Sequence, residues 1–214
     1  MAAPRIKICG IREPAALDAA MGSRADYAGL VFFPPSPRNV GMAEARALAS
    51  RSGERIARVG LFVDPDDALL ADAVAAGALD AIQLHGKEPP ARVAQVRERY
   101  GLPVWKALPV AKAEDVAKAR DYKGAADLIL FDAKTPDDAA LPGGMGLAFD
   151  WSLLAGWHDA MAWGLAGGLT PANVCEAIAQ TGAPLVDTSS GVETAPGVKD
   201  VDKIAAFCKA ARQP

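Results

Sequence analysis

The sequence has no excess of positive charge and no long apolar run. Its 23 Lys and Arg residues against 26 Asp and Glu residues give a net charge of −3, which offers no basic surface to attract nucleic acid or anionic lipid. The longest apolar stretches, such as residues 28–33, fall far short of the roughly 20 residues that cross a bilayer. We therefore expect no nucleic-acid partner and no membrane association, and the N-terminal residues contain no apolar segment typical of a signal peptide.

Cysteine and histidine are also scarce. The three cysteines, Cys9, Cys175 and Cys208, are scattered and include no C-x-x-C pair, so we expect reduced thiols and a cytoplasmic location rather than a disulfide scaffold. The two histidines, His85 and His158, lie far apart in the sequence, which does not suit a metal site. Neither a G-x-x-x-x-G-K-[ST] nor a G-x-G-x-x-G motif occurs, so no nucleotide cofactor is expected.

Along the whole sequence, short apolar runs alternate with Ala-rich segments. Eight strands are predicted, at residues 5–9, 27–32, 56–63, 81–84, 104–107, 128–132, 160–166 and 185–187. Most are continuous apolar runs, which is typical of strands that are covered on both faces.

The segments between the strands predict helices. Their ranges are 13–21, 43–50, 65–76, 90–100, 112–122, 171–180 and 201–211, with a short helix near residues 150–155. We expect Asp64 to cap the third helix and Thr170 the sixth, each followed by a proline at the first helical position. Eight right-handed βαβ units in 214 residues predict an α/β fold, a (β/α)₈ TIM barrel that forms a single domain over residues 1–214. An open, doubly wound sheet is the alternative.

In such a barrel, the active site lies in the loops that follow the strands. Gly167 and Gly168 follow the seventh strand, and Ser190 and Gly191 follow the eighth. Glycines let backbone N–H groups approach a phosphate closely, and a short helix N-terminus in these loops favours an anion. We therefore predict a small, phosphorylated ligand; the alternative is that these glycines only form tight turns.

Three further side chains lie at predicted strand ends. Cys9 ends the first strand, where nearby helix N-termini favour a thiolate. Asp132 follows four apolar residues, an environment that raises the pKa of a carboxyl group and suits a general acid. Arg38, in the proline-rich segment 33–38, offers a guanidinium for a carboxylate or phosphate. The alternatives are a buried structural thiol, a helix cap and a surface arginine.

Eight segments in this order resemble the phosphoribosylanthranilate isomerase family over nearly the whole chain. They are Lys7-Ile8-Cys9-Gly10, residues 33–38, 59–63 and 83–86, Phe131-Asp132, and residues 142–146, 166–169 and 187–193. Each segment alone is weakly specific, but the ordered set is highly specific.

The resemblance implies a cofactor-free Amadori rearrangement in tryptophan biosynthesis. N-(5′-phosphoribosyl)anthranilate would become 1-(o-carboxyphenylamino)-1-deoxyribulose 5-phosphate. Cys9 matches the general base that removes the proton from C2′, and Asp132 matches the general acid that protonates the furanose oxygen. Arg38 matches the arginine near the anthranilate carboxylate. The remaining matches are His85 and Asp187 near the pocket, and Gly167, Gly168, Ser190 and Gly191 in the phosphate loops.

Two positions depart from the family pattern. Met145 stands where the loop after the sixth strand commonly has threonine, and Thr188 stands where an aliphatic residue is common. Neither change removes the acid, the base or a phosphate loop. Other phosphate-binding barrels remain as alternatives: a sugar-phosphate epimerase, indole-glycerol-phosphate synthase, a histidine-pathway isomerase or a non-catalytic binding protein. The chain is expected to be a monomer or a homodimer.

Overall fold

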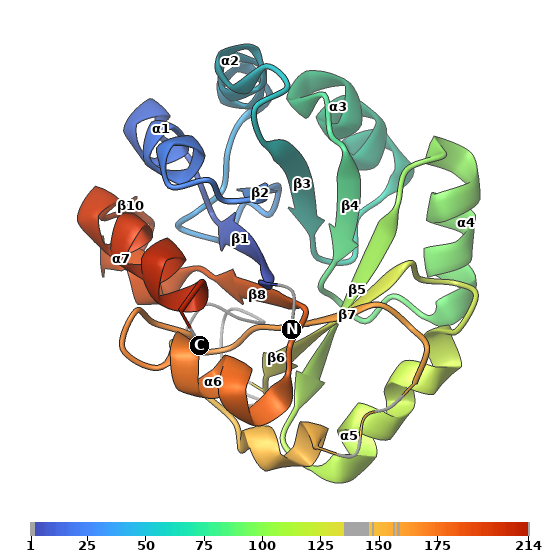
Figure 1. Ribbon diagram of the computed structural model, residues 1–214. Coiled ribbons are helices and arrows are strands. Elements are labelled where there is room, and N and C mark those ends of the chain that lie inside the picture. The colour runs from blue at the N-terminus through green and yellow to red at the C-terminus, as the bar shows by residue number, and fades with distance from the viewer. Residues whose placement is uncertain (1–2, 135–145, 147, 156, 158, 214) are drawn as a thin grey trace.

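The computed structural model describes residues 3–134, 146, 148–155, 157 and 159–213. Eight parallel strands form a closed barrel in sequence order, with the first strand paired to the last, and the helices lie outside them (Figure 1). The strands are β1 (Arg5–Cys9), β2 (Tyr27–Val31), β3 (Ala57–Phe62), β4 (Ala81–Leu84), β5 (Val104–Val110), β6 (Leu128–Ala133), β7 (Trp163–Leu165) and β8 (Leu185–Thr188). The prediction of a TIM barrel is confirmed, and the open sheet is excluded.

Seven α-helices and three 3₁₀ segments connect the strands in the described part of the chain. The α-helices are α1 (Pro14–Gly22), α2 (Met42–Ser52), α3 (Asp67–Gly77), α4 (Pro90–Tyr100), α5 (Ala113–Ala117), α6 (Val174–Thr181) and α7 (Val201–Ala211). The 3₁₀ segments are η1 (Lys118–Tyr122), η2 (Trp151–Leu154) and η3 (Ser190–Val192). A small antiparallel hairpin, β9 (Glu193–Ala195) and β10 (Val198–Lys199), follows β8 and was not expected from the sequence.

The two cap predictions are wrong. Asp64 has a left-handed backbone with φ of 45°, and its carboxylate accepts the N–H of Lys87 at 2.7 Å. Asp66 caps α3 instead, because its side chain accepts the N–H of Leu69. At α6, the side chain of Asn173 accepts the N–H of Thr170 at 2.7 Å, and this closed turn delays the start of the helix.

Other boundaries also differ. The predicted helix 112–122 continues as a 3₁₀ segment after Ala117, and the predicted seventh strand, 160–166, pairs only over Trp163–Leu165. The short helix near residue 150 is a 3₁₀ segment capped by Asp150, whose carboxylate accepts the N–H of Ser152. No helix within the described residues is long and apolar enough to cross a membrane.

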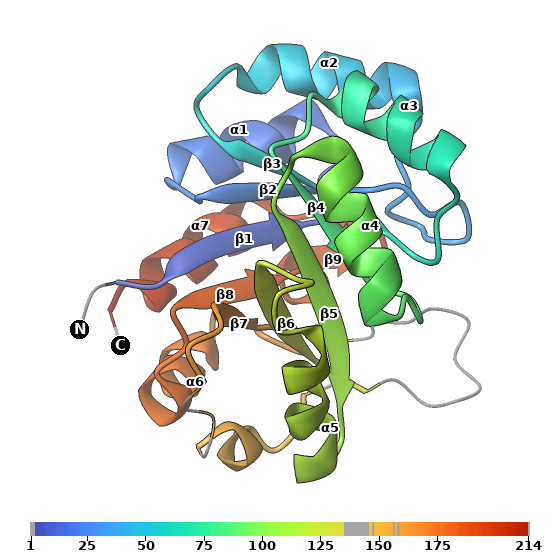
Figure 2. The same ribbon diagram turned by 90° about the vertical axis from the view of Figure 1, so that its right-hand side faces the viewer.

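Alternation along β1 decides what the barrel interior contains. Side chains of successive strand residues point to opposite faces, so Ile6 and Ile8 join the large apolar layer between strands and helices. Lys7 and Cys9 therefore face the interior, where Lys7 is fully buried and pairs with β8. Both chain termini lie at the end of the barrel where the strands begin (Figure 2), so the site residues at the strand ends lie at the opposite mouth.

Candidate active site

Cys9 and Lys7 converge on one point inside the barrel. A Cβ atom built on Gly29 of β2 would lie 2.9 Å from Cys9 Sγ and 3.2 Å from Lys7 Cε. The glycine therefore leaves the space that both side chains use. Lys7 Nζ lies 2.9 Å from Asp187 Oδ2, and the barrel register places these two residues side by side on β1 and β8.

Burial is the largest single influence on the pKa of each member of this group. It raises the pKa of the Cys9 thiol, although the charges of Lys7 and Lys199 act in the opposite direction. This net direction is opposite to the one that helix N-termini led us to expect. Burial likewise raises the pKa of Asp187, against the attraction of Lys7, while at Lys7 the carboxylate of Asp187 and the nearby Cys9 outweigh burial and raise the pKa.

Asp132 lies on the same rim of the barrel, near the end of β6. One carboxylate oxygen accepts the N–H of Ala133 at 2.8 Å, and the other lies 3.2 Å from His85 Nε2. Gly167 adopts φ of 84°, and a Cβ at this position would lie 2.4 Å from the Ala133 nitrogen. Only glycine lets the loop after β7 pack this closely against the carboxylate.

Arg38 is buried at the mouth and faces a carboxylate that the sequence analysis missed. Its Nε and Nη2 each donate to Glu193 at 2.8 Å. Lys199 Nζ also donates to Glu193, at 2.7 Å, and to the Ser189 carbonyl at 2.9 Å. The β9–β10 hairpin thus ties the loop after β2 to the loop after β8. Gly10 allows the approach, because a Cβ there would lie 2.6 Å from Arg38 Cδ.

The two predicted phosphate loops lie in contact with each other. A Cβ on Gly191 would lie 1.9 Å from the carbonyl oxygen of Leu169, and the Thr188 hydroxyl donates to the same oxygen at 2.7 Å. The unusual Thr188 therefore has a buried partner. Ser190 begins η3 directly at this junction, and Gly168 has φ of 64°. Met145 and His158 lie outside the described residues.

A second buried lysine supports the neighbouring rim. Lys106 Nζ on β5 lies 3.0 Å from Glu88 and donates to the Gly86 carbonyl at 2.8 Å. Glu88 also accepts the N–H groups of Asp64 and Gly86. This network fixes the loop that begins with His85.

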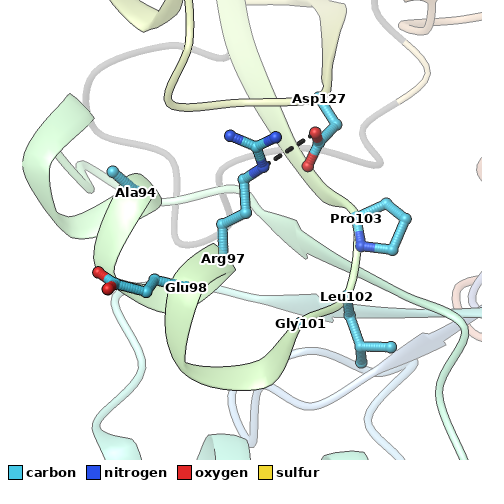
Figure 3. Close-up of a pocket in the computed structure, with 7 residues that line it drawn as sticks. All are labelled: Ala94, Arg97, Glu98, Gly101, Leu102, Pro103 and Asp127. Carbon is cyan, nitrogen blue, oxygen red and sulfur yellow. Dashed lines mark ion pairs between the residues drawn. The ribbon is translucent and has the colours of Figure 1, made fainter.

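A surface hollow of about 540 Å³ lies at the other end of the barrel. Its lining includes Pro103 and Asp127, which precede β5 and β6, and Arg97 of α4. Arg97 and Asp127 form an ion pair of 3.0 Å within it (Figure 3). It is therefore separate from the rim that carries Cys9 and Asp132. Among the described residues, no group of three His, Cys, Asp or Glu side chains could hold a metal ion.

Sequence reasoning found the strand ends but missed the partners across the barrel. Lys7, Glu193 and Lys199 were not singled out as functional residues. A charged residue two positions before Cys9 in the apolar run Arg5–Cys9 was an available signal for Lys7, because period-two alternation places both on one face. Glu193 and Lys199 had no comparable local signal.

Known proteins resemble this chain over nearly its full length. A family model described as N-(5'phosphoribosyl)anthranilate (PRA) isomerase matches residues 6–210. The chain is 55% identical over 207 residues to N-(5'-phosphoribosyl)anthranilate isomerase of Paramagnetospirillum magneticum, covering 97% of this chain and 96% of the relative. The crystal structure of phosphoribosyl anthranilate isomerase from Thermotoga maritima matches with a TM-score of 0.89 and 37% identity, covering 99% of this chain and all of that one.

A further solved structure is a phosphoribosyl anthranilate isomerase in complex with reduced 1-(o-carboxyphenylamino)-1-deoxyribulose 5-phosphate. It matches with a TM-score of 0.86 and 35% identity, covering 99% of this chain and 100% of that chain. Family, relatives and fold agree over nearly the full length. The chain therefore belongs to the N-(5'-phosphoribosyl)anthranilate isomerase family, whose members are enzymes of tryptophan biosynthesis.

Proposed function

We propose that Cys9 and Asp132 are the base and the acid of the isomerase reaction, which is the Amadori rearrangement of N-(5′-phosphoribosyl)anthranilate. The observation that carries the proposal is that both groups lie at strand ends on one rim of the barrel, Cys9 at the end of β1 and Asp132 near the end of β6. Lys7 lies beside both Cys9 and Asp187 in the barrel interior, with its ammonium 2.9 Å from Asp187 Oδ2.

The proposed sequence begins at Asp132. Its carboxyl proton goes to the furanose oxygen, the C1′–O bond breaks, and the lone pair of the anilino nitrogen forms the Schiff base. The Cys9 thiolate then takes the proton from C2′, the C–H electrons form the C1′=C2′ bond, and the π electrons of the C1′=N bond return to nitrogen, which gives an enolamine. The enol hydroxyl loses its proton and C1′ gains one, which gives the aminoketose. No cofactor is required for these proton transfers.

The remaining site residues have binding roles in this proposal. Arg38 would orient the anthranilate carboxylate from the mouth, where Glu193 fixes its position. His85, at 3.2 Å from Asp132, would orient the acid. Asp187 would hold the cationic partner of the base. The phosphate would lie against the loops of Gly167, Gly168, Ser190 and Gly191, the last two of which belong to η3.

The test is turnover of N-(5′-phosphoribosyl)anthranilate generated in the cuvette, followed by its fluorescence. We expect Cys9→Ala and Asp132→Asn each to lose at least ~10² in rate, the range for removal of a general acid or base. Cys175→Ala is the matched control, because this thiol lies on α6, away from the strand ends, and we expect full activity. Wild-type activity in Cys9→Ala, with the fold intact, would refute the role of Cys9.

The proposed role of the Cys9 thiol also has a consequence for where the protein is located. A thiol that acts as a base must stay reduced, which favours the cytoplasm. The substrate is a small phosphorylated molecule, and the chain is expected to act as a monomer or a homodimer. Light scattering at two protein concentrations distinguishes these two states.

A further inference from the structure

The barrel interior contains a lysine that the proposed reaction does not use. Lys7 has no exposed surface, and its ammonium lies 2.9 Å from Asp187 Oδ2. Burying an ammonium is costly unless its partner and the remaining hydrogen bonds compensate. A well-packed apolar pair could close the seam between β1 and β8 without that cost. The presence of a charged pair here therefore calls for a specific reason.

The Lys7–Asp187 pair is also incompletely satisfied. Asp187 Oδ1 is buried and has no hydrogen-bond partner within the described part of the chain. Lys106, the other lysine of the barrel interior, differs in this respect, because its ammonium donates to three backbone carbonyls as well as to Glu88. The hydrogen bonds of Lys106 thus give it a structural role. The ammonium of Lys7 instead lies beside one carboxylate oxygen and one neighbouring thiol.

That thiol is Cys9, the next inward-facing residue on β1. The Lys7 Cε and Cys9 Sγ atoms lie 3.2 and 2.9 Å from the same point above Gly29, so the ammonium acts on the sulfur at short range. Coulomb energy between two charges at this range in a protein interior is several times larger than in water.

We propose that Lys7, held by Asp187, is a positioning residue that keeps Cys9 available as a thiolate through an ammonium–thiolate pair inside the barrel. The proposal rests on the assignment of Cys9 as the base. When Cys9 takes the C2′ proton, the S–H bond forms, the thiolate charge disappears and the ammonium keeps Asp187 as its partner. Lys7 itself neither gains nor loses a proton in this step.

Other charges surround Cys9 and must be considered with Lys7. Lys199 on β10 lowers the pKa of the thiol and Asp187 on β8 raises it, so the two cations act together against burial. Among the described residues, the other titratable groups at this mouth include Arg38 with Glu193, His85 with Asp132 and Lys106 with Glu88.

The first experiment measures how fast iodoacetamide alkylates Cys9 between pH 6 and 10. Peptide mass spectrometry separates Cys9 from Cys175 and Cys208. Lys7→Met keeps the length of the side chain and removes its charge. We expect alkylation at pH 7 to slow about tenfold or more, since one pKa unit is a tenfold change in thiolate fraction, and the curve to move to higher pH.

Two variants separate this effect from damage to the fold. Asp187→Asn removes the negative charge near Cys9 and keeps an amide oxygen that accepts from Lys7, so the ammonium stays in place and we expect alkylation at pH 7 at least as fast as in the wild type. Lys106→Met is the matched control, because it also removes a fully buried lysine, and we expect the wild-type pH dependence of Cys9 alkylation. Slowing of equal size in all three variants would overturn the proposal, as would no change in Lys7→Met. If Lys7→Met does not fold, slower alkylation in Asp187→Asn overturns it.

Steady-state kinetics then connect the pair to turnover. Because Lys7 has no exposed surface, Lys7→Met should lower kcat and leave KM within about twofold, and higher pH should restore part of the lost kcat. A change confined to KM would overturn the proposal. Should Cys9→Ala instead keep full activity, the base assignment fails, while the alkylation curves still measure the effect of Lys7 on the thiol.

Discussion

Replacing Glu193 with glutamine should destabilise the fold by about 3 kcal/mol, the lower end of the range for breaking a buried ion pair from one side. The Glu193 side chain is 4% exposed, and its carboxylate accepts from Arg38 at 2.8 Å twice and from Lys199 at 2.7 Å. Glutamine keeps the shape of the side chain but offers one acceptor and no charge. Two buried cations would then lack their counter-ion.

The pH dependence has a defined sign. Arg38 and Lys199 overcome the effect of burial and lower the pKa of Glu193. A carboxylate with a lowered pKa in the folded state contributes fully above its unfolded value of about 4.3, and this contribution is lost as the pH falls through the folded value. The difference between wild type and Glu193→Gln should therefore be constant from pH 6 to 8 and shrink below pH ~4.3.

Urea unfolding, followed by tryptophan fluorescence at each pH, measures this difference. Asp18→Asn is the matched control. Arg51 donates to Asp18 in the same bidentate geometry, with Nε at 2.8 Å from the carboxylate, but both side chains are nearly half exposed. Solvent screens such a pair, so its loss should cost only a small fraction of the Glu193 effect. Equal losses in the two variants, or a Glu193 difference that persists unchanged at pH 3, would refute the role of burial.

Two further substitutions test the backbone. Ala78 directly follows α3 as its C-cap, in the left-handed region with φ of 42°, and is exposed. Ala78→Gly should therefore raise the free energy of unfolding by up to about 1 kcal/mol; a lower melting temperature would contradict this. Gly191→Ala places a Cβ 1.9 Å from the Leu169 oxygen and should force the two phosphate loops apart, which raises KM in the fluorescence assay. An unchanged KM would show that the junction of these loops does not contribute to binding.

The fold was predictable because its signals are local. Each buried strand is a short apolar run, and the alternation with helices indicates a barrel without knowledge of any long-range contact. The same logic placed Cys9 and Asp132 at strand ends. The cap prediction for α3 failed because two candidates lay close together: Asp64 and Asp66 are both suitable residues, and the left-handed backbone of Asp64 decided between them.

The partners of the site residues were not predictable for a different physical reason. Lys7 contacts a residue 180 positions away, and Arg38 contacts one 155 positions away. No local pattern carries such a pairing, since it depends on how the barrel closes. Burial of Cys9 is similarly a property of the closed barrel, and the direction of its pKa shift was missed because the sequence suggested the nearby helices but not the loss of solvent.

The ion pairs Lys7–Asp187 and Arg38–Glu193 both join the first two strand–helix units of the chain to the segment that begins with β8. Their basic members come from β1 and from the loop after β2, and their acids come from β8 and β9. A barrel without its last strand–helix unit would keep both cations and lose these two carboxylates. The charge balance of the site therefore favours the complete barrel over a truncated one, in addition to the apolar packing.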